Sequence, residues 1–356
     1  MIRFVRREAV PLWLSVAAPV GAGLVALLLT AVPLAISGAP IGRSFALLIE
    51  GSVGSVFALT ETMSRATPLI FTGLAAAVAF RAKLWNIGAE GQLYAGALAA
   101  VVVGTGAVAA PPFVLVPLVL LAGAAAGAAL LMGPVFFKSR FGADEVVTTL
   151  LMNFIVILFV QMMLEGPLKD PLSLGWPQSE PMVDEAVLPK LVDKMRVHAG
   201  LLVAIACAVA SHVLLERTLW GFQIRAVGES AAAARYAGVP MGATLVRVAL
   251  LSGGFAGLAG ACEVAGLKGY LTADLSPGFG YAGIVVAMLA GLSPLGVVPA
   301  ALFVAGVFVG ADTMSRTIGV SNYLADLVVA MSLLCVIVGG LFVRYELRLV
   351  RRGAQA

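Results

Sequence analysis

The sequence predicts an all-α fold, a polytopic bundle of transmembrane helices, and three observations lead to this prediction. Hydrophobic residues make up 61% of the chain, charged residues 12%, and the mean hydropathy is +1.03. A soluble domain carries about twice that charged fraction. The apolar residues gather into runs of roughly 18 or more, the length that crosses a hydrocarbon core as a helix. The 40 glycines favour close helix–helix packing in lipid.

Taken in order along the chain, the apolar runs predict about ten spans. The first run follows Arg3, Arg6 and Arg7 and is longer than the apolar part of a signal peptide, so we interpret it as an uncleaved span. Residues 44–60 are also apolar and are interpreted as an interfacial helix, a re-entrant helix or a further span. The ten predicted spans cover residues 12–37, 66–80, 89–108, 112–136, 146–164, 199–216, 244–265, 281–295, 298–314 and 323–343.

The distribution of positive charge predicts the orientation of these spans. With both termini inside, fifteen of the 23 Lys and Arg residues fall in inner segments. Cytoplasmic loops carry an excess of Lys and Arg, so the sequence predicts an N-in, C-in topology. We interpret residues 1–356 as a single transmembrane domain. Its longest outer loop covers residues 165–198, and its longest inner loop covers residues 217–243.

The centre of the inner loop is Ala-rich and predicts a short helix from Ser230 to Ala237. Glu229 and Ser230 suit the start of this helix, and Gly238 suits its end. An exposed helix on the inner face is suited to docking a transporter onto a motor protein. An ordinary amphipathic loop remains the alternative.

The segment RAKLWNIGAEGQL at residues 81–93 places Asn86, Glu90 and Gln92 between two apolar runs. Polar groups in or near a membrane usually face a bundle interior or a pathway, and broken helices of this kind build transporter sites. Trp85 offers an apolar wall, while Asn86 and Gln92 offer hydrogen-bond donors and acceptors. The alternative is a plain cytoplasmic turn followed by a helix that starts with the Glu90 carboxylate.

Two further polar segments are candidates for the same path. Thr149 and Asn153 lie four residues apart, so they share one helix face, where they either bond across helices or line the path. The segment SPGFGYAGIVV at residues 276–286 breaks a helix just before a span. Its Phe279 and Tyr281 suit stacking on a planar ligand, with an interfacial aromatic belt as the alternative.

Several functional classes lack support in the sequence. It contains no G-x-x-x-x-G-K-[ST] motif, so any ATP hydrolysis requires another chain. No basic stripe with interleaved aromatic residues is present, so we expect no nucleic-acid partner. Cys207, Cys262 and Cys335 lie in apolar runs and are interpreted as buried small hydrophobes, so we expect no metal site. No H-E-x-x-H or G-x-S-x-G motif is present, so we expect no catalytic residues.

Five segments, in order along the chain, resemble the permease subunits of bacterial ABC importers for nucleosides, within a wider group of simple-sugar and branched-chain amino-acid permeases. The resemblance runs from about residue 60 to 310, with Trp85 where the family more often has Phe and Glu229-Ser230 in place of a Gly-Asn-type pair. The five segments are RATPLIFTGLA (65–75), LWNIGAEGQL (84–93), GADEVVTTLLMN (142–153), RAVGESAAAARYAGV (225–239) and GYAGIVVAMLA (280–290).

The resemblance implies an assembly in the bacterial cytoplasmic (inner) membrane. Its parts are two permease subunits surrounded by lipid, two cytoplasmic ATPase subunits that bind ATP-Mg, and an external solute-binding protein, with no cofactor in this chain. It implies that the path lies near Asn86 to Gln92. It also assigns ATPase coupling to Gly228, Glu229, Ser230, Ala233, Arg235, Tyr236 and Gly238.

Two other interpretations of the function remain open. An ABC permease for simple sugars or another small solute fits the more widely shared inner-loop pattern. An ATP-independent secondary transporter requires a coupling-ion site, for which Glu90, Glu263 and Asp326 are the candidate carboxylates.

Overall fold

The computed structural model describes residues 2–6, 11–106 and 108–349. Arg7, Arg351 and Arg352, which count toward the predicted inside charge, lie outside these residues. The chain divides into two compact units, Met1–Ala58 with Gly306–Ala356, and Leu59–Ala305. The single transmembrane domain stays a prediction.

The first unit is built on helices from the two ends of the chain. α1 (Leu12–Ile36) packs along α13 (Asn322–Arg344), and α2 (Ile41–Val53) connects α1 to the start of α3 (Val56–Arg81). Strands β1 (Ile2–Arg6) and β2 (Tyr345–Leu349) pair antiparallel. Apart from this short ribbon, the elements of the described residues are helical, in agreement with the predicted all-α fold. Tyr345–Leu349 alternates polar and apolar residues, a period-2 pattern that favours a strand.

Residues 44–60 do not form a span of their own. They cover most of α2, which has 13 residues, and the first turn of α3. The predicted start of the second span at residue 66 was therefore wrong, because the helix begins ten residues earlier despite Glu61 and Arg65.

The second unit contains the remaining helices, except for the first residues of α3 and the second half of α12, which belong to the first unit. Residues 264–268 continue α10 as a π-helical turn, η2. The helices and turns of this part of the chain are α3, α4 (Ala89–Gly104), α5 (Pro112–Phe141), α6 (Glu145–Glu165), η1 (Asp184–Ala186), α7 (Gly200–Arg217), α8 (Leu219–Glu229), α9 (Ala231–Tyr236), α10 (Met241–Glu263), η2 (Val264–Lys268), α11 (Phe279–Leu289) and α12 (Pro294–Ile318).

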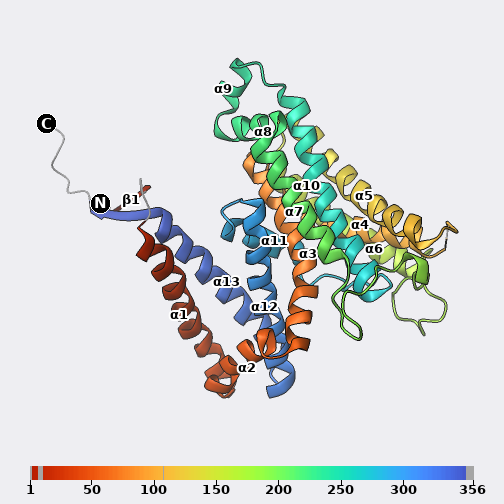
Figure 1. Ribbon diagram of the computed structural model, residues 1–356, viewed down its shortest axis with the longest axis horizontal. Coiled ribbons are helices and arrows are strands. Elements are labelled where there is room, and N and C mark those ends of the chain that lie inside the picture. The colour runs from red at the N-terminus through yellow and green to blue at the C-terminus, as the bar shows by residue number, and fades with distance from the viewer. Residues whose placement is uncertain (1, 7–10, 107, 350–356) are drawn as a thin grey trace. The chain divides into compact units, whose positions relative to one another are not determined.

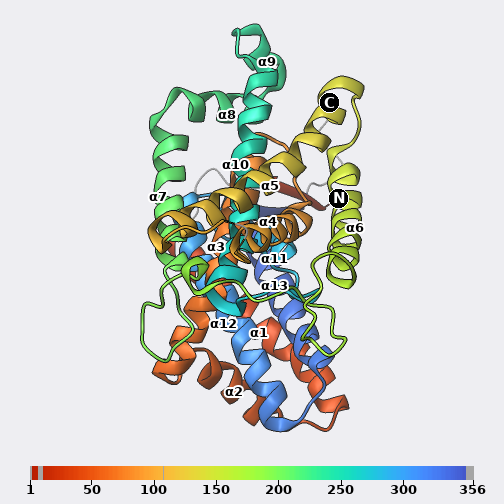
Figure 2. The same cartoon turned by 90° about the vertical axis from the view of Figure 1, so that its right-hand side faces the viewer.

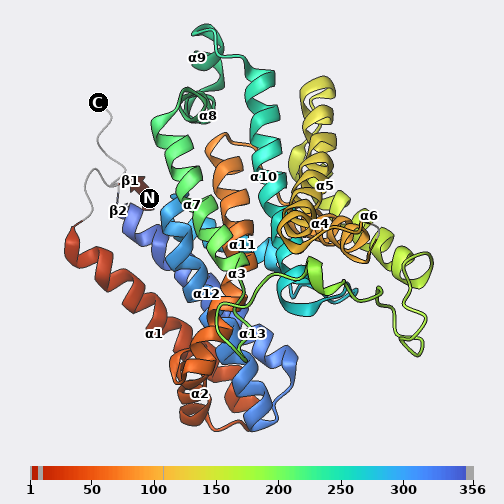
Figure 3. The same cartoon turned by 45° about the vertical axis from the view of Figure 1, so that its right-hand side comes forward.

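The core of the second unit is a close packing of α10 against α5 and α4 (Figures 1 and 3). Glycines at the crossings allow the backbones to approach. A Cβ on Gly257 would lie 2.1 Å from the Gly123 carbonyl oxygen, and a Cβ on Gly260 would lie 1.9 Å from that of Leu93. Small residues allow this kind of packing in lipid, where no hydrophobic force drives helices together.

The two long polar segments lie at opposite ends of the second unit (Figure 2). α8 and α9 form one end, and the connection between α6 and α7 forms the other. The sequence predicted one helix in the segment 217–243, whereas the structure has α8, α9 and the start of α10 there. α8 was missed because its Gly, Gln and Arg residues resemble a loop.

Seven helices among the described residues are long and apolar enough to cross a membrane. α4 has 16 residues and α11 has 11, so at 1.5 Å per residue both fall short of a hydrocarbon core of about 30 Å. The predicted spans 89–108 and 281–295 therefore end too late. The seven spanning helices are α3, α5, α6, α7, α10 with η2, α12 and part of α13.

Candidate functional site

The segment between α3 and α4 is irregular backbone buried inside the second unit. Leu84, Asn86 and Gly88 are all buried in this segment. Non-helical backbone at membrane depth is tolerated only where protein or a cavity covers it, because its polar groups need partners. The segment therefore requires polar side chains from neighbouring elements.

The Asn86 side chain closes a hydrogen-bonded ring with Gln92. The Asn86 amide nitrogen donates to the Gln92 carbonyl oxygen at 2.9 Å, and the Gln92 amide nitrogen donates back at 2.9 Å. Asn86 also donates to the Ser252 hydroxyl at 2.9 Å, and Ser252 donates to the Ala75 carbonyl oxygen at 2.8 Å. Both amides are buried and are satisfied by the protein itself.

Asn153 of α6 joins three segments that are far apart in the sequence. Its carbonyl oxygen accepts from the Gly91 N–H at 2.8 Å. Its amide donates to the Ile87 carbonyl oxygen at 3.0 Å and to the Tyr281 hydroxyl at 3.1 Å. The three polar segments that the sequence singled out therefore meet at one side chain.

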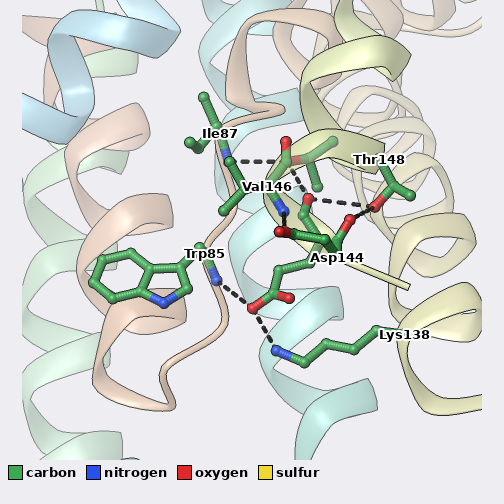
Figure 4. A network of polar contacts seen from close by, with 8 residues as sticks. Trp85, Ile87, Lys138, Asp144, Val146 and Thr148 are labelled. Carbon is green, nitrogen blue, oxygen red and sulfur yellow. Dashed lines mark hydrogen bonds and ion pairs between the residues drawn. The ribbon is translucent and has the colours of Figure 1, made fainter. Parts of the chain in front are cut away.

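Thr149 and Glu145, about one and two turns before Asn153 on α6, hold the same segment, and Figure 4 labels its Trp85 and Ile87. The Ile87 N–H donates to the Thr149 hydroxyl at 3.3 Å, and the Trp85 N–H donates to the Glu145 carboxylate at 3.4 Å. The same carboxylate forms an ion pair with Lys138 of α5. The Trp85 ring packs on Phe80, with a centroid distance of 4.7 Å, and the side chain is 44% exposed.

The start of α6 follows the sequence prediction. The Asp144 carboxylate accepts from the Val146 N–H at 2.8 Å and caps the helix (Figure 4). A carboxylate at this position is favoured by the helix dipole. The cap fixes where α6 begins and so the depth at which Thr149 and Asn153 lie.

The N-terminal ends of the two short helices α4 and α11 meet at Glu90. The Glu90 carboxylate accepts from the Gly280 N–H at 2.6 Å. A Cβ on Gly280 would lie 2.3 Å from the Glu90 nitrogen, so glycine permits the close approach. Both helix dipoles place partial positive charge here, and the Glu90 carboxylate offsets it.

The eight predicted path residues all lie where the α3–α4 segment, α4, α6 and α11 meet, and we call this region the junction. Only two of their side chains are exposed. Trp85 is partly exposed, as is Tyr281 at 40%. Phe279 is buried at the start of α11, where its carbonyl oxygen accepts from the Thr72 hydroxyl at 2.9 Å. The other five are Asn86, Glu90, Gln92, Thr149 and Asn153, and they are buried and hold backbone or each other.

Sequence reasoning missed three side chains that complete this junction. Ser252, Thr72 and Lys138 provide the bonds to Asn86, Phe279 and Glu145 described above. Ser252 and Thr72 lie within long apolar runs, where a single hydroxyl gives no signal. Lys138 was counted only as a loop charge.

The predicted coupling residues lie at the opposite end of the unit from the α6–α7 connection. The Ser230 hydroxyl accepts from the Ala233 N–H at 3.2 Å and caps α9, and Gly238 ends the helix with φ +80°. The predicted helix boundaries are confirmed. Ala233 and Arg235 are exposed, and Tyr236 is 96% exposed.

α8 connects this end to the irregular segment after α3. A Cβ on Gly228 would lie 1.8 Å from the Arg81 carbonyl oxygen, and the Lys83 amine donates to the Glu229 carbonyl oxygen at 3.4 Å. The Arg81 side chain pairs with Glu216 at 2.6 Å. The segment that leads to Asn86 is therefore anchored on α8 and on the end of α7.

The remaining candidate carboxylates do not join the junction. Glu263 is buried at the end of α10, and Asp326 is exposed on α13. Cys207, Cys262 and Cys335 are free thiols.

Comparison with known proteins gives consistent matches. A family model described as branched-chain amino acid transport system / permease component matches residues 58–337. A glucose ABC transporter permease protein from Haloferax volcanii is 37% identical, over 98% of this chain and 95% of its own. A guanosine ABC transporter permease protein from Bacillus subtilis is 36% identical, over 85% and 87%. A nucleoside ABC transporter permease protein from Lactococcus lactis is 29% identical, over 76% of each.

These matches place the chain among transport components rather than enzymes, and ATP hydrolysis belongs to a separate ATPase. The family match covers α3 to α12 and most of α13, and so includes both the junction and α9. The chain is a multi-pass membrane protein that belongs to the family of ABC transporter permease components.

Proposed function

We propose that this chain is the membrane-spanning permease subunit of an ABC importer that takes up nucleosides across the bacterial cytoplasmic membrane. The observation that carries the proposal is the 36% identity, over 85% of the chain, to a permease protein whose name specifies guanosine. The more distant relative from Lactococcus lactis is also named for nucleosides.

The charge of the junction supports an uncharged solute. Two helix N-termini converge on it, and such a pair would attract an anion. The Glu90 carboxylate already occupies one of them through Gly280. A neutral molecule with a planar base and hydroxyl groups fits the partly exposed rings of Trp85 and Tyr281 better than a phosphate does.

In this proposal the site residues act in two ways. Trp85 and Tyr281 contact the solute, while the buried Asn86, Glu90, Gln92, Thr149, Asn153 and Phe279 hold the shape of the path. Motion of the ATPase reaches them through α9, α8 and the Arg81–Lys83 turn, since Gly228 and Glu229 contact that turn.

The proposed assembly contains two permease subunits, two cytoplasmic ATPase subunits and an external solute-binding protein. ATP-Mg binds the ATPase, and this chain binds no cofactor of its own. α9 docks on the ATPase, and the residues 166–199 face the binding protein. The exposed apolar side chains of α5 and α6 face lipid or the second permease subunit.

The N-in, C-in orientation belongs to this proposal and has a direct test. After replacement of the three native cysteines, Leu172→Cys and Ala232→Cys place single thiols at exposed positions at the two ends of the second unit. An impermeant thiol reagent added outside intact cells is expected to label Leu172→Cys alone. Labelling of Ala232→Cys alone contradicts the orientation.

A second candidate function is uptake of a hexose, because the 37% identical relative is named for glucose. Vesicles that contain the permease, ATPase and binding proteins separate the two. We expect labelled uridine or adenosine to accumulate and excess glucose not to compete. Glucose uptake without competition by nucleosides rejects the nucleoside proposal and leaves the permease family standing.

A further inference from the structure

A pocket of about 350 Å³ lies at the end of the second unit opposite α9. Its walls come from two segments, the α6–α7 connection and the chain from the end of η2 to Asp274. We propose that this pocket is a separate binding site for the solute, which holds a hydroxylated ring before it reaches the α4–α11 junction. The inference rests on the proposed uptake of nucleosides or sugars.

The two walls are held together by a regular set of hydrogen bonds. The Ser179 N–H donates to the Leu271 carbonyl oxygen at 2.9 Å, and the Leu271 N–H donates to the Ser179 hydroxyl at 2.9 Å. Gln178 and Thr272 form an antiparallel bridge beside them. Backbone pairing of this kind fixes the positions of the side chains on either side, so the pocket has a defined shape.

Thr272 supplies a hydrogen-bonding group that the protein leaves unused. Its hydroxyl oxygen is buried and has no hydrogen-bond partner among residues 2–6, 11–106 and 108–349, and the residue is 6% exposed. Buried polar groups almost always have partners, because an unpaired one loses its hydration without compensation. Thr272 lines the pocket, so a ligand hydroxyl placed there would complete its bonding.

The charges of the pocket favour a neutral ligand. Arg196 lines it and pairs with Glu61 at 3.1 Å. Lys268 and Asp274 both line it, and the Lys268 amine donates to the Asp274 carbonyl oxygen at 3.2 Å. The lining contributes two cations and one carboxylate, and Glu61, which does not line the pocket, offsets Arg196. A phosphorylated ligand therefore gains little net attraction, while the Asp274 carboxylate suits acceptance from ring hydroxyls.

The remaining lining residues suit a ring. Trp176 and Tyr270 offer aromatic rings, and Gln178, whose amide nitrogen donates to the Asp170 carboxylate at 3.2 Å, offers its carbonyl oxygen. The volume lies at the lower end of the range for small-molecule sites, which begins at roughly 300 Å³. A nucleoside and a hexose share the chemistry that these groups recognise, a ring with neighbouring hydroxyls.

Binding to the purified full-length permease in lipid nanodiscs, without ATPase or binding protein, tests the inference. Uridine, glucose and leucine are the three probes, measured by calorimetry. We expect uridine or glucose to bind and leucine not to bind. Thr272→Val is expected to weaken binding about tenfold, the loss of one good hydrogen bond to a buried group, without lowering thermal stability.

Thr30→Val is the matched control, because Thr30 is also buried but its hydroxyl already donates to the Ala26 carbonyl oxygen at 2.7 Å. We expect the Thr30→Val protein to bind the probes as tightly as the wild type does. The inference is overturned if Thr272→Val binds the probes as tightly as the wild type, or if neither hydroxylated probe binds. Nucleoside uptake by the complete importer that Thr272→Val leaves unchanged also overturns it, while the proposed function stands. Binding of glucose but not uridine, weakened by Thr272→Val, supports the pocket and rejects the nucleoside assignment.

Discussion

At the scale of single residues, the polar side chains of the junction bond mainly to the backbone of their neighbours. Asn153 alone satisfies one N–H and one carbonyl group of the buried segment between α3 and α4. Backbone groups without water must find partners inside the protein, so each such side chain replaces a missing helix hydrogen bond. Loss of one of them costs more than the bond, because the group left behind stays buried and unpaired.

We therefore predict that Asn153→Ala destabilises the purified protein strongly. It leaves the Gly91 N–H and the Ile87 carbonyl unpaired, at about 1–3 kcal/mol each. Tyr281→Phe is the matched variant, since it removes one of the three bonds and leaves the Asn153 amide bonded to Ile87. Thermal unfolding in detergent should show a clearly larger decrease in the unfolding midpoint for Asn153→Ala than for Tyr281→Phe. Equal decreases would contradict the assigned role.

His198 gives a prediction for pH. It lies before α7, its Nδ1 accepts from the Gly200 N–H at 3.2 Å, and burial lowers its pKa from 6.5 to about 4. Between these two values the unfolded chain binds the proton and the folded chain does not, so stability falls as the pH falls from about 6.5 to about 4. Unfolding midpoints at pH 7 and pH 5 should differ more in the wild type than in His198→Gln. The same difference in both would show that another group titrates.

The candidate site shows what the sequence does and does not reveal at this scale. Asn86, Glu90, Thr149 and Asn153 stand out, because a polar residue in an apolar run is rare. Their hydrogen-bond partners could not be predicted, because the ring between Asn86 and Gln92 depends on how the chain turns between them. The sequence therefore predicted which residues gather, but gave no means to see that their amides are already occupied.

At the scale of elements, glycine contacts set how closely the helices of the second unit pack. Gly123 and Gly127 of α5 face Gly253 and Gly257 of α10. Contacts of this kind bring backbones together and gain dispersion over the whole crossing. A single added methyl group must move a helix, and not only a side chain.

Gly257→Ala and Gly254→Ala form a matched pair on α10. The first places a Cβ 2.1 Å from the Gly123 carbonyl oxygen, whereas the nearest atom to the second is the Ala124 carbonyl oxygen at 3.7 Å. We expect Gly257→Ala to lower the unfolding midpoint and the yield of monodisperse protein. Gly254→Ala should be neutral or stabilising by about 0.5–1 kcal/mol, because alanine favours a helix. A destabilised Gly254→Ala with an unaffected Gly257→Ala would contradict the packing.

The prediction for assembly of the importer concerns α9. Ala233 is exposed on α9, and a carboxylate placed there by Ala233→Glu would be buried without a partner in a docked interface. Co-purification of the ATPase should fall tenfold or more while the permease still inserts in the membrane. Leu172→Glu adds the same charge at the opposite end, on a side chain that is 86% exposed, and should leave co-purification unchanged. Unchanged co-purification with Ala233→Glu would remove α9 from the interface.

How far the elements could be predicted depends on their length. Long apolar helices such as α5 and α6 appear within a few residues of their predicted ends. The predicted span 281–295 failed, because an apolar run does not show that α11 ends at Leu289 and turns before Pro294. Capping residues were the better guide, since Ser230 and Gly238 marked the ends of α9 correctly.

At the scale of the whole molecule, the second unit connects an ATPase-docking end to a solute-facing end in the proposed importer. Within that unit, contacts run from α8 to the Arg81–Lys83 turn, and from there to the segment that Asn86 and Asn153 hold. In the proposed importer, the separate ATPase supplies the energy for the movement of this chain at α9. An ATP-independent transporter would instead depend on a gradient.

ATP-driven uptake by proteoliposomes with defined contents tests this central claim most directly. The vesicles contain the permease and ATPase subunits, and ATP-Mg is placed on the side of α9 while the binding protein and labelled uridine are on the other. We predict accumulation that requires ATP and binding protein, persists when ion gradients are collapsed, and is lost in Ala233→Glu. Accumulation without ATP that disappears when the proton or sodium gradient is collapsed would contradict the account.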